Sequence, residues 1–289
     1  MYECWYQIES KIQKYAYFLS LLINPAQMDF HTLTRHKGKF KNDFINDIKI
    51  VEDLFKFVLK IKNITTDNYK NKIFEELQEF EKMFGEYIKN ECSLDNYNKA
   101  FDNIDKIFTS EKMMNKFVIL NFNYSTYLKK YLHLDEDTMV NIHGNTDSPI
   151  FGIDFEEKED DELAEEFDIT RYTKASRIFM NTTIQNEFTL PSKDEIENIY
   201  FFGHSLSKAD YSYFQTIFDS YDLYHSNVQL HFLYTEYDSE INIRKIQHDA
   251  IMNLLKIYGD TFENKHHGRN LITKLLMEKR IHMREITND

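Results

Sequence analysis

Apolar residues recur at steps of three and four through the first part of the chain, which is the spacing of one buried face on an α-helix. The first such face precedes Pro25, a residue that ends helices, and consists of Trp5, Ile8, Ile12, Tyr15, Leu19 and Leu22. The second face consists of Phe40, Phe44, Ile48, Val51, Phe55, Val58 and Leu59. The third breaks near Cys92-Ser93 and consists of Ile73, Leu77, Phe80, Phe84 and Ile88. A fourth, with Asp95 or Asn96 as its N-cap, consists of Tyr97, Phe101, Ile104 and Phe108. Residues 1–112 are therefore predicted to be all-helical, as a cap over a pocket, an insertion or a contact surface for a partner.

Beyond residue 115 the pattern changes to short apolar runs that alternate with helical stretches. The predicted strands are 117–121, 139–143, 150–153, 198–203, 228–235 and 280–286. The predicted helices are 124–132, 173–187, 208–220, 239–257 and 268–279. This alternation indicates an α/β core over residues 113–289, with a mostly parallel sheet and flanking helices. The acidic stretch at 154–168 is predicted to be a solvated loop or an exposed helix, or alternatively a lid over the site.

Composition excludes several classes of protein. The 289 residues carry a formal net charge of −13, which disfavours general nucleic-acid binding. The two cysteines, Cys4 and Cys92, supply neither a disulfide framework nor a zinc quartet, and no metal site is predicted from the His and Cys spacing. The longest early apolar run, 15–23, is too short to span a bilayer, and the acidic Glu3 and Glu9 before it are unlike a signal peptide. A cytoplasmic protein without membrane contact is expected.

Three of the predicted strands end in residues that can contact a ligand. The first strand leads into Asn121, Asn123 and Ser125, the second into His143 and Gly144, and the fourth into Gly203, His204 and Ser205. Ligands of open α/β sheets bind at the carboxyl ends of the strands, so these residues are predicted to share one site. Histidine suits the role of general base because its unperturbed pKa lies near neutral pH, and an Asn amide can hold a hydroxyl or a water.

These segments resemble the AbiH family of bacterial proteins of phage abortive infection. The resemblance is carried by Asn121-Phe-Asn-Tyr-Ser125, by Asn141-Ile-His-Gly144 and by Gly203-His-Ser-Leu-Ser-Lys-Ala-Asp210. Trp5 with Ile8-Glu9 is also similar to an early helical signature of that family. The resemblance implies a role in anti-phage defence. The partners considered are a phage-derived trigger and further copies of the same chain in a homo-oligomer.

AbiH proteins are in turn distantly similar to sirtuin-like, Rossmann-like folds that bind NAD. That similarity implies NAD or a related nucleotide as substrate, with His143 as catalytic base and Asn123 near the ribose. It places Gly203 and Ser205 on the adenosine side of the dinucleotide. Further ligand contacts are expected from Asn121, Ser125, Gly144, His204 and Asp210. The implied activity is hydrolysis of the nicotinamide–ribose bond, as in an NAD glycohydrolase.

The sequence departs from these families in three respects. No strand followed by a Gly-rich phosphate loop is recognisable before residue 115, and a reading frame truncated at its start is one interpretation of that. Ser125 stands where an Asp is often found. The zinc-binding cysteines of sirtuin deacylases are missing, which makes lysine deacylation a poor hypothesis.

Each candidate residue also has a structural interpretation. His143 could cap a strand end, Asn121 and Asn123 could be turn residues, and His204 could be packed or face solvent. Ser205 could N-cap the following helix, with Asp210 in its first turn. At the level of function, a non-catalytic nucleotide-binding sensor and an inactive truncated remnant are the alternatives to an enzyme.

Overall fold

The computed structural model describes residues 66–91, 94–110, 117–135, 137–152, 169–181, 189–236 and 242–286. The predicted helical faces between Trp5 and Leu59 and the acidic stretch at 154–168 lie outside these residues. Among the helices of the described ranges, none combines the length and the apolar composition needed to cross a lipid bilayer.

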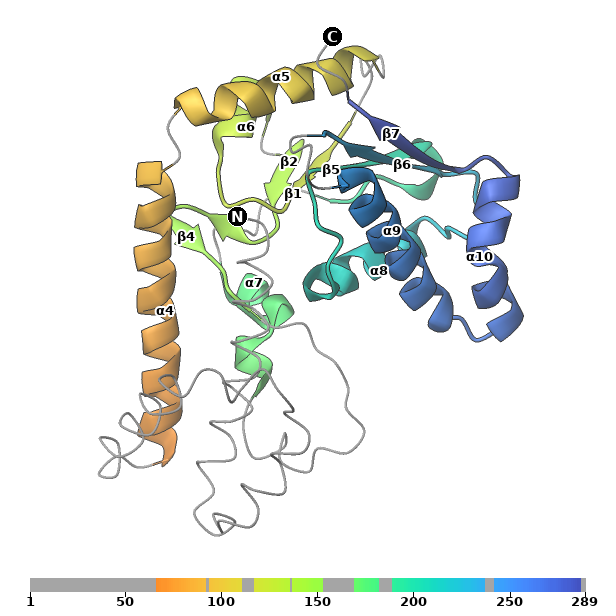
Figure 1. Cartoon of the computed structure of the whole chain (residues 1–289). Coiled ribbons are helices and arrows are strands. Elements are labelled where there is room, and N and C mark those ends of the chain that lie inside the picture. Colours follow the sequence, from red (N-terminus) through yellow and green to blue (C-terminus); the bar gives the residue numbers. More distant parts are fainter. Residues whose placement is uncertain are drawn as a thin grey trace.

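Within the described residues, two helices precede the first strand. The third and fourth predicted helices are confirmed as α4 (Thr66–Glu91) and α5 (Leu94–Ser110). Figure 1 shows α4 as a long helix beside β4, which it contacts, and α5 beside α6. On its inner face α4 buries Glu81 and Phe84. The described part of the helical region therefore packs directly on the α/β part, and the domain boundary after residue 112 stays a prediction.

The strands are short and mostly parallel. In chain order they are β1 (Ile119–Asn121), β2 (Met139–Asn141), β3 (Gly144–Asn145), β4 (Ser148–Pro149), β5 (Asn198–Phe202), β6 (Gln229–Tyr234) and β7 (Ile281–Glu285). They form a parallel β1-β2 pair, an antiparallel β3-β4 pair and a parallel sheet in the order β5-β6-β7. The helices between them are α6 (Tyr127–Tyr131), α7 (Lys174–Met180), α8 (Tyr211–Ser220), α9 (Ile243–Asp260) and α10 (Lys265–Met277).

Most of the predicted elements are confirmed, with ends that differ by a few residues. The exception is the strand predicted at 150–153, which is wrong, because residues 150–152 are not in a strand. The strand pairing lies just before them, in the β3-β4 hairpin. Phe151 is buried instead by aromatic contacts with Phe80, Phe84 and Tyr124. An apolar run that packs against a helix has the same sequence signature as a short buried strand.

The described strands form a mixed α/β structure in three small sheets, not one continuous sheet. Even so, Leu120 and Phe122 pack against the core cluster to which Phe201 of β5 belongs. The ring centroid of Phe122, just after β1, lies 4.6 Å from that of His204, just after β5. The carboxyl ends of the β1-β2 pair and of β5 therefore face the same region. A Rossmann-like or sirtuin-like sheet is a finer description than these strand pairs provide.

The main hydrophobic core lies between the three-stranded sheet and helices α8, α9 and α10. Alternate residues of the strands point into it, and Leu230 and Phe232 of β6 are fully buried. From the helices, Phe218, Leu255 and Leu271 are likewise fully buried. In Figure 1, α9 and α10 lie side by side below β6 and β7, and the two helices contact each other.

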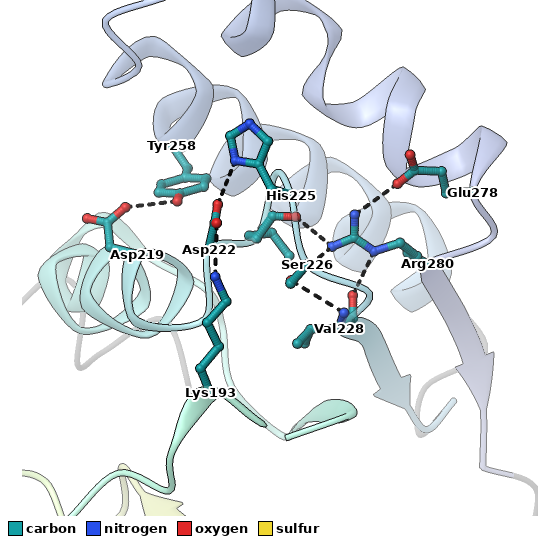
Figure 2. Close-up of polar contacts among 10 residues, drawn as sticks. Lys193, Asp219, Asp222, His225, Ser226, Val228, Tyr258, Glu278 and Arg280 are labelled. Carbon is teal, nitrogen blue, oxygen red and sulfur yellow. Dashed lines mark hydrogen bonds and ion pairs between the residues drawn. The ribbon is translucent and has the colours of Figure 1, made fainter. Parts of the chain in front are cut away.

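One buried guanidinium fixes the amino-terminal end of this sheet (Figure 2). Arg280, which is 4% exposed, donates from Nε to the carbonyl of Val228 at 3.0 Å and from Nη2 to that of Leu223 at 2.5 Å. Nη1 donates to Glu278 at 2.9 Å. The side chain thus satisfies carbonyls of the α8–β6 connection that the sheet leaves unpaired.

We predict that Arg280→Lys destabilises the protein by about 1–3 kcal/mol, because one ammonium cannot reach all three acceptors and leaves a buried carbonyl unsatisfied. Urea unfolding followed by circular dichroism measures the change. Glu278→Gln is the matched control, because that partner is 39% exposed and its loss is expected to cost less than about 1 kcal/mol. An equal loss of unfolding free energy in the two variants would contradict the structural role of Arg280.

Candidate functional site

The three predicted strand ends meet at one aromatic ring. Phe122, directly after β1, lies with its ring centroid 5.6 Å from that of His143 and 4.6 Å from that of His204. The same ring contacts Tyr213 and Phe214 of α8. The segments after β1, β2 and β5 therefore come together in space, as their sequence predicted.

The Asn residues after β1 form an internal network. Asn121, which is buried, donates from Nδ2 to the Ser125 carbonyl and to Asn141 Oδ1, both at 3.1 Å. Its Oδ1 accepts the backbone N–H and the amide of Asn123. Asn141 donates to the carbonyls of Asn123 and Ser125. Asn121 and Asn141 thus shape the turn that leaves β1, and both hydrogen-bonding ends of the Asn121 amide are occupied.

His143 occupies the corresponding position after β2. The N–H of Ile142 donates to the Asn121 carbonyl and that of Ile150 donates to the His143 carbonyl, both at 2.8 Å. Gly144 follows with a positive φ of 75°, and a Cβ there would lie 2.1 Å from the Ser148 carbonyl oxygen. The turn into β3 therefore requires glycine, and this turn keeps the His143 imidazole in the interior.

A buried carboxylate organises the centre of the site. Asp210 is 8% exposed and takes the N-cap position of α8, but its side chain makes no capping hydrogen bond. Its Oδ1 accepts from His143 Nε2 at 2.9 Å and from Lys174 Nζ at 2.8 Å. Its Oδ2 lies 3.1 Å from His204 Nε2. Three cationic or ionisable donors from three segments converge on one aspartate.

The two histidines differ in which nitrogen atoms are occupied. His204 Nδ1 accepts the backbone N–H of Leu206 at 2.9 Å, so its Nε2 carries the hydrogen that is donated to Asp210. Both nitrogens of His204 are therefore engaged within the protein. His143 also donates from Nε2 to Asp210, but its Nδ1 is buried and has no hydrogen-bond partner among the described residues. Of the two imidazoles, only His143 has a free lone pair.

The charges of the cluster follow from this geometry. Burial alone would raise the pKa of the Asp210 carboxyl, but hydrogen bonds from His143 and His204 and the charge of Lys174 hold it far below its ordinary value. Burial lowers the pKa of His143, and Lys174 and His204 lower it further, while Asp210 opposes the shift. These directions favour an ionised Asp210 and a neutral His143.

Exposed residues adjoin the buried cluster. Asn123, Gly203 and Ser205 are all exposed. Gly203 has a φ of 67°, and apart from its chain neighbours no heavy atom of the described residues lies within 4 Å of the position that a Cβ would take. The strand end after β5 is therefore open, in contrast to the closely packed turn at Gly144.

The sequence prediction included His143, His204 and Asp210 but missed Lys174, which is 2% exposed. Lys174 begins α7, where the Thr173 hydroxyl accepts the Ser176 N–H as N-cap. It lies in a polar segment that reads as a solvated helix, so no local signal indicates that the lysine is buried.

A second buried ion pair was also missed. Arg177 of α7 donates from Nη2 to Glu81 Oε2 of α4 at 2.6 Å, and Glu81 Oε1 accepts the Phe151 N–H at 2.8 Å. Burial raises the pKa of Glu81, and Arg177 opposes that shift. This pair holds α7, and with it Lys174, against α4. In the described part of the chain no group of three His, Cys, Asp or Glu side chains is arranged to hold a metal ion.

We predict that Asp210→Asn costs about 3–5 kcal/mol of the free energy of unfolding at neutral pH, because it leaves the Lys174 ammonium buried without its counter-ion. The low pKa of Asp210 makes its stabilisation complete above the pKa of an unfolded Asp, about 4, and reduces it as pH falls further. The difference between wild type and variant should therefore narrow in acid, as measured by urea unfolding. Asp222→Asn is the control, because this surface carboxylate pairs with Lys193 and His225 and should cost less than about 1 kcal/mol. A similar loss in both variants would contradict the central role of Asp210.

Comparison with known proteins agrees with the motifs of this site. The sequence matches the family described as bacteriophage abortive infection AbiH over residues 1–234, a range that includes all three strand ends and Asp210. No curated protein and no solved structure matches the chain. Because the family match covers well over half of the 289 residues, the chain belongs to the AbiH family of bacteriophage abortive infection proteins.

Proposed function

We propose that this AbiH protein hydrolyses a nucleotide, with NAD as the substrate and Nδ1 of His143 as the general base. The observation that carries the proposal is the imidazole itself, whose Nε2 is fixed on Asp210 while Nδ1 is buried without a hydrogen-bond partner in the part of the chain that the structure describes. An unsatisfied buried polar group costs about 1–3 kcal/mol, and such groups call for an explanation, catalysis among them. A neutral nitrogen with a free lone pair is what a general base requires.

The proposed reaction breaks the bond between C1′ of the ribose and the nicotinamide nitrogen and forms a bond from C1′ to a water oxygen. Nicotinamide carries a positive charge while bonded to the ribose and leaves as a neutral molecule, so no strong acid is needed to expel it. The water loses a proton, which His143 accepts at Nδ1 and then releases to solvent. The Asp210 carboxylate stabilises the imidazolium that exists between those steps, as the Asp of a Ser-His-Asp triad does.

The surroundings of His143 suit a ligand at the carboxyl ends of parallel strands, the usual place in Rossmann-like and sirtuin-like folds. We assign Asn123 to the ribose, and exposed Gly203 and Ser205 to the adenosine side, where the open space at Gly203 admits close backbone approach. The rings of Phe122, Tyr124 and Tyr213 contact His143. A substrate therefore reaches Nδ1 by displacing one of these rings.

Binding of a nucleotide without turnover is the second candidate function. The enclosure of His143 by three rings favours it, because it keeps water from the base in the absence of a ligand. If the protein hydrolyses NAD, a phage-derived signal would act as the trigger, since constitutive loss of NAD would damage an uninfected host.

We predict that the purified full-length protein releases nicotinamide from NAD and that His143→Gln reduces the rate by about 100-fold or more, because general-base catalysis contributes roughly that factor. Nicotinamide is quantified by liquid chromatography, with and without lysate from phage-infected cells. His225→Gln is the matched control, because His225 also pairs with an aspartate, Asp222 at 2.8 Å, but is exposed at the other end of the sheet (Figure 2). Its rate should equal that of the wild type.

Calorimetry with NAD separates the two candidate functions in the same samples. Binding by wild type without nicotinamide release in either condition would favour the sensor over the enzyme. Neither binding nor release, with and without infected lysate, would reject a nucleotide as the ligand.

The pH dependence of turnover provides a further prediction. A base acts in its neutral form, and burial lowers the pKa of His143, so kcat/KM should rise with pH only in the acidic range and be level around neutrality. Initial rates from about pH 5 to about pH 9 test this profile. A rate that falls steadily as pH rises through neutrality would indicate an acid in place of a base.

A further inference from the structure

We propose that Lys174 is a positioning residue that keeps Asp210 ionised and His143 in its neutral Nε2–H form, so that Nδ1 stays available as a base. The catalytic part of this inference rests on the proposed function, whereas the effect of Lys174 on the imidazole is a property of the free protein. Lys174 belongs to none of the three strand-end motifs, and it reaches the site from a separate helix.

The contacts of Lys174 place its ammonium on the carboxylate and not in the ligand region. Nζ donates to Asp210 Oδ1 at 2.8 Å and to the Ala209 carbonyl at 2.5 Å. Oδ1 is also the oxygen that accepts from His143 Nε2. The ammonium and the imidazole thus share one oxygen atom.

The position of the Lys174 backbone is fixed by close packing. A Cβ at Gly152 would lie 2.8 Å from the Lys174 nitrogen, so the backbone at Gly152 packs directly against the start of α7. One turn further, Arg177 joins α7 to Glu81 of α4. The lysine therefore has little freedom to leave Asp210.

The charges that face His143 explain why the lysine matters. Asp210 comes from the start of α8, Lys174 from α7 and His204 from the segment after β5, while Tyr124 and Tyr213 contribute neutral rings. Among these groups, Lys174 contributes a positive charge that lowers the pKa of His143. With it in place, Asp210 already has a counter-ion, and a second positive charge on His143 is disfavoured. Without it, the buried carboxylate would find its counter-charge by protonating His143, and Nδ1 would then carry a hydrogen.

The test is the titration of His143 in Lys174→Met, followed by heteronuclear NMR of the imidazole nitrogens in the full-length protein. The His143 signal is assigned by its loss in His143→Gln. We expect the variant to hold a protonated imidazole to a pH about one unit higher than wild type, which is a ~10-fold change in the ratio of the two forms. Lys174→Arg, which keeps the charge, should retain most of the wild-type titration. Where NAD turnover is present, the acidic limb of the rate profile should move by the same amount while the rate at high pH recovers.

Lys193→Met is the matched control, because Lys193 pairs with Asp222 beside His225 in an exposed Lys–Asp–His set (Figure 2). It should leave the His143 titration unchanged. Circular dichroism reports folding, and Lys174→Gln, a neutral side chain that keeps a donor, replaces Lys174→Met if the latter does not fold. An unchanged His143 titration in a folded, uncharged variant overturns the inference, whether or not the protein turns over NAD. A shifted titration in a protein that leaves NAD intact upholds the role of Lys174 and rejects the proposed function instead.

Discussion

The site depends on one buried carboxylate. Asp210 receives donors from the segment after β2, the segment after β5 and the start of α7. An ionised aspartate in the interior is stable only if its charge and lone pairs are satisfied, so these segments must all be in place at once. The two oxygens of Asp210 thereby set the relative positions of elements that no common sheet connects.

The same requirement fixes the chemistry of the two histidines. Both ring nitrogens of His204 are occupied, because Nδ1 accepts the Leu206 N–H and Nε2 donates to the carboxylate. Within the described ranges, His143 is held by one nitrogen alone, and its other nitrogen has no hydrogen-bond partner. A carboxylate that orients an imidazole and leaves its second nitrogen free is the arrangement general-base catalysis uses, here with Nδ1 as the free atom. Membership of the AbiH family gives this arrangement a setting in phage defence, while its chemistry depends on the atoms around His143.

Beyond the site, the fold relies on buried cations that join distant segments. Arg280 satisfies carbonyls before β6, and Arg177 links α7 to α4 through Glu81. Lys174 links α7 to the start of α8 by donating to Asp210. All three side chains are buried. Without them, the acceptors and anions that they contact would lie in the interior without a partner, which costs free energy. Short strands in separate small sheets contribute few long-range hydrogen bonds, and these cations supply cross-links between them.

Local pattern determined the helices and most strands, because periods of 3.6 and two residues are properties of neighbouring positions. It also placed His143 and Gly203 at strand ends, where the chain must turn. Tertiary structure alone decided that Phe151 packs on α4 instead of extending a strand, and that Asp210 turns from its helix cap to two histidines. It alone buried Lys174, whose segment is polar and whose partner lies 36 residues away. Burial of a charge depends on a counter-charge brought close by folding, and that information is absent from any short window of sequence.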